Sequence, residues 1–416
     1  MTHQAWKPAG IALLLGVAVS YGQPASAGSP KNQLFSRIYG CEAAVRIGNS
    51  MGEPVEGWPW WRIEKTYGFL DRFLPSGRRE KDRAVPQRFG QDWVYRAYRR
   101  EPGWGEDGME RYKLVTSAII RKGGRITIED LARQWTEDID PSKFGYHLGP
   151  QDLIIYNLLK GGLPPWEVGR YAIWPGFMGT SKMIIPLGIV NACRPDNAAR
   201  DALDIARIKD VQGRPIWRDD KYSADGRLSS TLVWDYALEN AAAIAAATAE
   251  ALRPGATVNS IIETALAQLP GGARREVETV LGFARKAKDW KEIRPLYDKY
   301  YEGKPVSNAI EILAGGLACF LLADGRPREA ILYAVNLGRD TDCKAYVAGG
   351  LAGAFRGIEA VPAEWVETVE KAILTDTYTV SRRTARQAAE GLYQACLNEM
   401  RRSKTADSEI ETLLAK

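Results

Sequence analysis

Two aspartates in the last third of the chain are the residues best placed to do chemistry. Asp340 and Asp342 stand one residue apart in the segment 338–343, Gly-Arg-Asp-Thr-Asp-Cys, where a helix is about to begin. Successive residues of a helix are about 100° apart, so the two side chains could not share one helix face. In a turn that leads into a helix, however, both carboxylates can converge. Such a pair supplies the hard oxygen ligands that Mg²⁺, Ca²⁺ and Mn²⁺ prefer.

The residues that follow this pair are unusually small. They are Ala345, Ala348, Gly349, Gly350, Ala352, Gly353, Ala354 and Gly357. A helix made of such residues would let another helix approach closely and bury the site. The motif alone also has a simpler interpretation, in which one Asp caps the helix and the other forms an Asx turn. Other segments of the chain are needed to choose between the metal-ligand and the capping interpretations.

The small number of histidines limits the catalytic and metal-binding sites that the chain can form. The 416 residues have an ordinary globular composition, 45% hydrophobic and 26% charged, and allow one large domain or two. Only two histidines are present, His3 and His147. A His-rich metal site is therefore excluded, and a Ser-His-Asp or Cys-His arrangement would rest on His147 alone, because His3 lies in the leader described next. Carboxylates and a metal are the expected tools of an enzyme.

The first residues have the features of an export signal. Lys7 is the only charge before Lys31, an apolar run follows at 9–19, and Ala-Ser-Ala at 25–27 matches a small-x-small cleavage site. We expect residues 1–27 to be a signal peptide and the mature chain to be periplasmic or secreted, with an uncleaved N-terminal anchor as the alternative. No other stretch is long enough to span a membrane.

Charge and cysteine usage exclude two further classes of protein. The formal net charge is +5, or +4 once Lys7 is removed, and the basic residues are scattered, without a nucleic-acid-binding motif. Only a weak attraction for phosphates follows. Five cysteines lie far apart without CxxC spacing, which argues against a zinc site and leaves one disulfide open.

Helical periodicity runs through almost the whole chain. We expect helices at 33–48, 62–73, 107–122, 231–252, 259–269, 274–287, 309–323, 364–373 and 382–402, and another opened by a capping pattern at 127–130. Alternating runs typical of strands are scarce, so the predicted fold is all-α. We expect one helical domain over 33–402, an exposed loop at 212–227 and a solvated tail at 403–416.

Four segments, far apart in the chain, form a pattern together. The first is 47–57, Ile-Gly-Asn-Ser-Met-Gly-Glu-Pro-Val-Glu-Gly, and the second is 103–110, Gly-Trp-Gly-Glu-Asp-Gly-Met-Glu. The third joins Gly-Phe-Met-Gly at 176–179 to Ile-Pro-Leu-Gly at 185–188. The fourth is 338–343, closed by Gly-Ile-Glu-Ala-Val-Pro-Ala-Glu-Trp at 357–365. In order and spacing this pattern resembles the ADP-ribosylglycohydrolase family, from about Ile38 to Ala372.

The resemblance implies an orthogonal bundle of helices with Mg²⁺ ions in a central acidic cleft. The family cleaves the bond at C1″ of an ADP-ribosyl group on Arg or Ser, or in related substrates. Carried onto this sequence, its pattern implies the metal ligands Glu106, Asp107, Asp340, Asp342 and Cys343. Glu56, Glu106 and Asp107 are the implied catalytic residues, with Glu56 as general acid or base or as a gate over the metals. Metal ions there can chelate ribose hydroxyls and polarise a water.

This chain departs from the family pattern at several positions. Gly105 and Gly108 stand where the family's T-D-D-T turn has hydroxyl residues, and Glu106 replaces an Asp. Cys343 occupies a further hydroxyl position, and a thiol is a poor partner for Mg²⁺. A register shift of one residue would make Glu110 a competing ligand. One or two ions, with Mn²⁺ as an alternative to Mg²⁺, stay open, and the departures favour one.

Further residues of these segments are candidates for contact with the substrate. They are Asn49, Ser50, Trp174, Gly176, Gly179 and Arg339. Asn49 stands where the family has an Asp outside the ligand set, and Arg339 could bind a phosphate or pair with a neighbouring acid. Aromatic faces at Trp58, Trp60, Trp61 or Trp174 could stack on a sugar or adenine, or serve packing alone. Without the resemblance, Glu106 and Asp107 could be first-turn acids favoured by the helix dipole.

Two functions from different classes follow from these residues. The first is a Mg²⁺-dependent hydrolase of an N- or O-glycosidic bond in an ADP-ribosyl or related ribofuranosyl group, on a small molecule or a protein. Export would favour a furanoside glycan or an extracellular nucleotide conjugate among its substrates. The second is a degenerate, non-catalytic member of the fold that binds a ligand or serves structurally. A His-dependent hydrolase would have to use His147.

Overall fold

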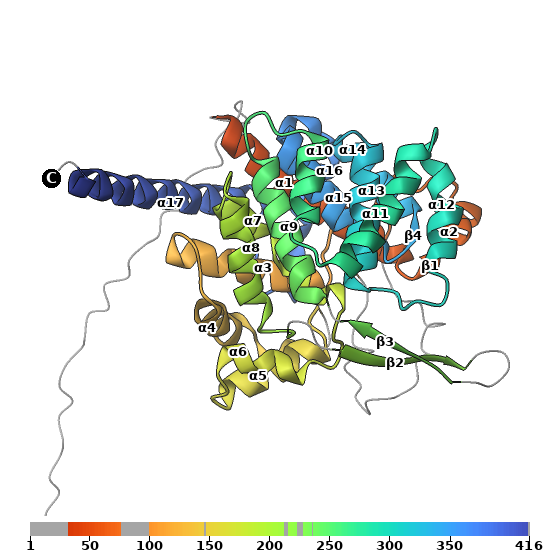
Figure 1. Cartoon of the computed structure of the whole chain (residues 1–416), viewed down its shortest axis with the longest axis horizontal. Helices are drawn as coiled ribbons and strands as arrows, with labels where there is room; N and C mark the ends of the chain where they lie inside the picture. The colour runs from red at the N-terminus through yellow and green to blue at the C-terminus, as the bar shows by residue number, and fades with distance from the viewer. Residues whose placement is uncertain are drawn as a thin grey trace, which may run out of the picture.

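The computed structural model describes residues 32–75, 100–144, 147–211, 215–222, 228–234 and 236–414. Within these ranges it is a bundle of helices with two short antiparallel strand pairs, so the all-α prediction is confirmed (Figure 1). The expected signal peptide at 1–27 lies outside the described residues. The α-helices are α1 (Gln33–Gly52), α2 (Trp60–Tyr67), α3 (Asp107–Lys122), α4 (Ile128–Asp138), α5 (Pro150–Lys160), α6 (Pro165–Val168), α7 (Ile185–Val190), α8 (Pro195–Ala206), α9 (Ala237–Ala251), α10 (Val258–Leu266), α11 (Gly271–Lys286), α12 (Ile293–Tyr300), α13 (Ala309–Leu322), α14 (Pro327–Asn336), α15 (Thr341–Arg356), α16 (Ala363–Thr375) and α17 (Ala385–Leu414).

Two helices from opposite ends of the chain, α1 and α15, pack along each other in the core. Glycines allow their backbones to touch. A Cβ atom added to Gly353 would lie 2.2 Å from the carbonyl oxygen of Gly40, and one added to Gly48 would lie 2.4 Å from the carbonyl oxygen of Ala345. The small residues after Asp342 therefore serve the close helix approach expected of them.

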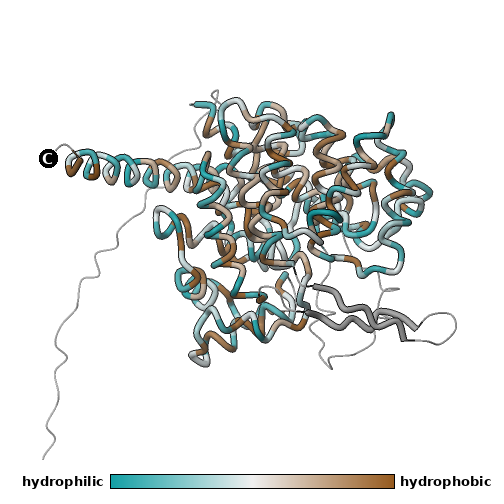
Figure 2. Tube along the Cα trace, in the orientation of Figure 1, coloured by the Kyte–Doolittle hydropathy of each residue, from teal (hydrophilic) through white to brown (hydrophobic). Residues whose placement is uncertain are grey.

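The other helices enclose this pair. Helices α13 and α14 pack on α15, while α14, α16 and α17 pack on α1, and α7, α8 and α10 pack on α9. Figure 2 shows hydrophobic residues gathered in the central helices, whereas the projecting end of α17 is mostly hydrophilic. No helix among the described residues is both long and apolar enough to cross a membrane.

The contact between α1 and α15 also positions the Asp-Thr-Asp turn. A Cβ atom at Gly52, the last residue of α1, would lie 2.5 Å from both the nitrogen and the Cα of Asp342. The hydroxyl of Thr341 donates a hydrogen bond to the carbonyl oxygen of Gly52 at 2.7 Å. The end of one helix thus supports the start of the other.

A two-residue strand pair attaches the loop after α1 to the same turn. In β1 (Trp58–Pro59) and β4 (Gly338–Arg339), Trp58 lies opposite Arg339 and Pro59 opposite Gly338. The nitrogen of Gly57 donates to the carbonyl oxygen of Arg339 at 2.8 Å. Arg339 has a φ of +60°, a conformation that non-glycine residues rarely adopt. This pairing places Glu56 next to the Asp-Thr-Asp turn.

Several sequence expectations need correction. The segment expected as an exposed loop at 212–227 contributes to an antiparallel hairpin of β2 (Pro215–Tyr222) and β3 (Leu228–Trp234). The helix expected from Thr231 begins instead at Ala237, because the Thr, Val and Trp residues at 231–234 favour strand pairing over the Ala-rich helix that follows. Helix α17 continues to Leu414, through the expected tail, although residues 404–414 are exposed. None of the five cysteines, all of them described, forms a disulfide.

Replacing Gly353 by Ala should destabilise the fold, because the new methyl group would collide with the backbone of Gly40. We expect the free energy of unfolding to fall by about 1–3 kcal/mol, the usual cost of overpacking a core. Urea unfolding of the full chain measures it. The matched control is Gly282→Ala in α11, where an added Cβ meets open space. Equal behaviour of the two variants would contradict the close contact.

Candidate active site

The four segments singled out in the sequence meet at one cavity of about 320 Å³. Its walls come from the loop after α1, the start of α3, the segment before α7, the loop after α8 and the start of α15. Five of its lining residues carry carboxylates and three are cationic. The lining residues are Glu56, Glu106, Asp107, Arg111, Gln151, Trp174, Phe177, Met178, Gly179, Lys182, Lys209, Ser307, Asp340, Asp342 and Cys343.

Asp340 and Asp342 converge at the start of α15, as their spacing predicts. Asp340 is the N-cap residue: its Oδ1 accepts a hydrogen bond from the Cys343 nitrogen at 3.2 Å. Its Oδ2 and the Oδ1 of Asp342 are buried and have no hydrogen-bond donor among the described residues. Burial and the adjacent Asp342 carboxylate raise the pKa of Asp340 to about 7. The capping and ligand interpretations of this motif are therefore compatible.

These two buried oxygens can hold one cation. A ligand atom from each of Asp340, Asp342 and Cys343 lies within 4.8 Å of the others. Unpartnered carboxylate oxygens are costly to bury, and a divalent ion would satisfy both. The Cys343 sulfur is a soft ligand and therefore a poor one for a hard ion. Burial and the Asp340 and Asp342 carboxylates also raise the pKa of its thiol well above the usual value. The residues present thus fit one ion held by the two aspartates.

The second acidic pair, Glu106 and Asp107, begins α3 on the facing wall. Glu106 caps that helix by accepting a hydrogen bond from the Gly108 nitrogen at 3.0 Å. Burial and the neighbouring Asp107 carboxylate raise the pKa of Glu106 to about 8. Asp107 is more open, with its side chain 40% exposed, and its Oδ2 lies 3.2 Å from Arg111 Nη1. Burial alone would raise its pKa, but Arg111 and Glu106 together hold it well below the usual value.

A lysine that our sequence analysis did not single out joins the two acidic pairs. The Lys182 ammonium contacts both Glu106 Oε1 and Asp342 Oδ2, and the side chain is only 2% exposed. Burial would lower the pKa of Lys182, but the surrounding carboxylates, Asp342 first, raise it well above its usual value. It is the only charged residue between Arg170 and Arg194, a signal that could have marked it.

Asn49 is buried next to the acidic groups and does not line the cavity. Its Nδ2 donates to Glu106 Oε1 at 2.8 Å and to Asp342 Oδ2 at 3.2 Å, while its Oδ1 accepts from the Glu106 nitrogen. The side chain is fully buried. Asn49 therefore positions carboxylates from both pairs, and the substrate contact proposed for it has no support in this geometry.

Three other substrate candidates also lie off the cavity. Ser50 is buried, and its hydroxyl accepts a hydrogen bond from the Gly103 nitrogen at 2.9 Å. Gly176 donates its N–H to Asp210. Arg339 pairs with the buried Glu311, with Nε and Nη2 at 2.5 and 3.0 Å from its oxygens, so the pairing alternative describes it. Trp174 and Gly179 line the cavity, and their role in binding stays a prediction.

Three of the four candidate tryptophans also lie off the cavity. Arg62 lies over the Trp58 ring at 3.8 Å, and Arg294 lies over the Trp60 ring at 4.6 Å. Trp61 is 53% exposed. None of these three appears in the cavity lining, whereas Trp174 does. An aromatic platform for a sugar or base would therefore rest on Trp174.

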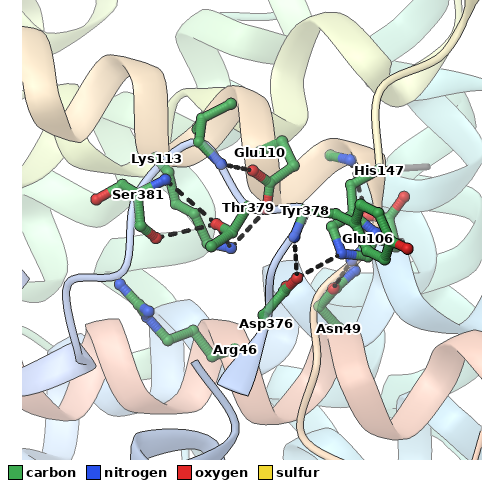
Figure 3. A network of polar contacts seen from close by, with 12 residues as sticks. Arg46, Asn49, Glu106, Glu110, Lys113, His147, Asp376, Tyr378, Thr379 and Ser381 are labelled. Carbon is green, nitrogen blue, oxygen red and sulfur yellow. Dashed lines mark hydrogen bonds and ion pairs between the residues drawn. The ribbon is translucent and has the colours of Figure 1, made fainter. Parts of the chain in front are cut away.

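Two alternatives from the sequence, Glu110 and His147, have other partners, drawn in Figure 3 together with Asn49 and Glu106. Glu110 accepts hydrogen bonds from Lys113 at 2.6 Å and from the Val380 nitrogen at 2.6 Å, so it anchors the segment before α17 and is not a ligand of the acidic turn. His147 Nε2 lies 3.0 Å from Asp376 Oδ1 and is buried there. Neither residue lines the cavity, which removes the geometric basis for a His147-dependent hydrolase.

Comparison with known proteins agrees with this arrangement. Residues 229–402, which include the Asp-Thr-Asp turn, match the family model described as ADP-ribosylglycohydrolase. The chain is 24% identical over 344 residues to the Escherichia coli K12 protein YegU, covering 78% of this chain and 89% of that protein. A solved structure titled "ADP-ribosylglycohydrolase-related protein complex" shares the fold with a TM-score of 0.58 and 20% identity, over 87% of this chain and 99% of the other. The family match and the relative support the resemblance of this chain to the ADP-ribosylglycohydrolase family, and with it a glycohydrolase-type function, while the solved structure shows the shared fold.

Proposed function

We propose that the protein is a metal-dependent hydrolase that cleaves an N- or O-glycosidic bond of an ADP-ribosyl or related ribofuranosyl group. The observation that carries the proposal is the pair of buried, unpartnered oxygens, Asp340 Oδ2 and Asp342 Oδ1, beside a cavity large enough for a ligand. Mg²⁺ is the proposed ion, with Mn²⁺ as an alternative, because both donors are carboxylate oxygens. When bound, the ion would polarise an oxygen of the substrate or of a water.

The chain's own residues supply the remaining chemistry in this proposal. Breaking a ribofuranosyl bond builds positive charge on the anomeric carbon, and carboxylates in the cavity wall can stabilise it. Glu56 is the proposed general acid or base. Its loop is fixed to the acidic turn by the β1–β4 pair, and the side chain lines the cavity. Asp107, charged and partly open, can orient a water or a hydroxyl group.

Cationic side chains on the facing wall favour a substrate that carries phosphate. Arg111 and Lys209 both line the cavity close to Gly179, where an added Cβ would lie 3.4 Å from Arg111 Nη2 and from Lys209 Nζ. Lys209 Nζ lies 3.7 Å from Asp152 Oδ1, a longer contact than the 2.8 Å between Arg111 Nη1 and Asp152 Oδ2. We propose that Lys209 interacts with an anionic group of the substrate, which favours an ADP-ribosyl group over a neutral furanoside.

A second candidate function is non-catalytic ligand binding or a structural role. One observation favours it: Lys182 already neutralises Glu106 and Asp342, so part of the acidic site is stable without an ion. The absence of hydroxyl residues at Gly105 and Gly108 agrees with this alternative. Turnover of substrate separates the two functions, because a ligand-binding member would bind ADP-ribose without hydrolysing any conjugate.

Replacing Asp340 by Asn should remove most of the activity. We expect kcat/KM on ADP-ribosylated peptides or O-acetyl-ADP-ribose to fall by about a hundredfold or more, because the ion would lose a charged ligand. Hydrolysis is measured on the full chain after chelation, with Mg²⁺ or Mn²⁺ restored. Asp140→Asn, a matched change at an exposed N-cap away from the cavity, should leave activity unchanged. Absence of hydrolysis by the wild type with either ion would favour the non-catalytic alternative.

Replacing Lys209 by Met tests the class of substrate. For a phosphate-bearing substrate we expect KM to rise about tenfold with little change in kcat, the value of one charge-assisted hydrogen bond. For a neutral ribofuranoside KM should not change. Steady-state kinetics on an ADP-ribosyl substrate and a nitrophenyl ribofuranoside give both numbers. Equal KM for wild type and variant on the ADP-ribosyl substrate would reject the proposed contact.

We also propose that the protein is exported, on the strength of the residues before Lys31. The apolar run at 9–19 and the Ala-Ser-Ala sequence at 25–27 support cleavage after Ala27. Mass spectrometry of the protein expressed with its full leader in a bacterial host should find Gly28 as the N-terminus in the periplasmic or culture fraction. Retention of Met1 in the cytosolic fraction would reject export.

A further inference from the structure

We propose that the Lys182 ammonium takes the place of one of the two metal ions that the family resemblance implies, so that this site holds a single divalent ion. The inference rests on the proposed function, which assigns that ion to Asp340 and Asp342. It concerns a different part of the site, the space between those residues and Glu106.

The ammonium group of Lys182 lies between the two acidic pairs. Lys182 contacts one carboxylate from each acidic pair, Glu106 Oε1 from the start of α3 and Asp342 Oδ2 from the start of α15. Asn49 Nδ2 donates to the same two oxygens. A cation bridging the two pairs would need these oxygens, and both already have a positively charged partner. Among the described residues, the fully buried oxygens of the cavity's carboxylates that have no donor are Asp340 Oδ2 and Asp342 Oδ1, and both belong to the start of α15.

The missing side chain at Gly108 leaves room for the lysine stem. A Cβ atom added to Gly108 would lie 2.1 Å from Lys182 Cδ and 2.7 Å from Lys182 Cε. Gly108 stands where the family's T-D-D-T turn has a hydroxyl residue, and any side chain there would collide with the lysine stem. In this chain a side chain at position 108 and the Lys182 stem therefore exclude each other, and the space is filled by a fixed cation.

A second divalent ion would also be repelled by the lysine. It would lie against the Lys182 ammonium, which is buried between Glu106 and Asp342, and two cations in contact repel each other strongly at low dielectric.

Hydrogen bonds also fix the backbone segment that carries Lys182. It lies on a 3₁₀ helix, Met178–Met183, whose Ser181 hydroxyl donates to the Ala237 carbonyl oxygen at 3.2 Å and accepts from Asn240 Nδ2 at 2.7 Å. Because backbone and stem are both packed, the ammonium is a fixed charge of the site. An ammonium has three donors, and a third N–H beyond the two carboxylates can meet a substrate hydroxyl in the cavity that Lys182 lines.

Counting bound ions tests the inference without reference to activity. The full chain is treated with chelator and titrated with Mn²⁺, and bound ions are counted by calorimetry and by electron paramagnetic resonance of free Mn²⁺. We expect one ion per wild-type chain. Lys182→Met and the double variant Lys182→Ala with Gly108→Thr, which removes the stem that a threonine would meet, should bind two, with a signal from spin coupling between neighbouring ions. The matched control is Lys209→Met, which removes a cation from the same cavity that pairs with neither Glu106 nor Asp342 and should bind one.

The outcomes separate this inference from the proposed function. Two ions on the wild type would overturn the role of Lys182 and leave the metal-dependent hydrolase intact. No ion on the wild type would overturn both. One ion on every variant, with thermal melting that shows them folded, would mean that Lys182 does not exclude a second ion and would also overturn the inference. The wild-type count alone decides if a variant does not fold.

Discussion

Backbone contact between α1 and α15 is the constraint on which the candidate site depends. Gly40 and Gly353 touch near one end of this contact, and Gly52 touches Asp342 at the other, where no side chain fits between the helices. With the helices at that separation, Asn49 of α1 reaches both Asp342 and Glu106. The acidic turn is thus positioned by a close-packed interface, and a change of a few tenths of an ångström there would be felt by the carboxylates.

A second buried network supports the turn from its other side. Arg339, in a left-handed conformation, pairs with the buried Glu311, while the Lys344 ammonium donates to the Gly338 carbonyl oxygen and lies 4.6 Å from the centre of the Tyr297 ring. Removing one partner of such a pair typically costs about 3–5 kcal/mol, because a buried charge is left alone. The unusual backbone at Arg339 persists because these contacts fix it, and it directs the chain into the cap at Asp340.

Local patterns in the sequence predicted what is local in the structure. Helix α3 has the predicted bounds, the cap at Thr127 forms, and the small residues of α15 meet another helix as expected. The hairpin at 215–234 was missed because its charged, breaker-rich residues suggest a loop. Glu110 was an open alternative because one residue of register on α3 decides which acid faces the cavity, and only the contacts with Lys113 and Val380 show that it faces away.

Lys182 could not be placed from sequence because its partners lie 76 and 160 positions away, and nothing local links a lysine before α7 to acids that begin α3 and α15. In the sequence, Gly108 suggests only that a potential ligand is missing. The structure shows that the missing side chain leaves space for the Lys182 stem. Because Lys182 is buried, its stem and a side chain at position 108 cannot share this space. Three buried carboxyl groups around one cavity, Glu106, Asp340 and Asp342, need nearby positive charge, and a covalently attached ammonium supplies part of it at every ion concentration. In the proposed arrangement, the site would need a dissolved metal ion only for the oxygens that the lysine does not reach.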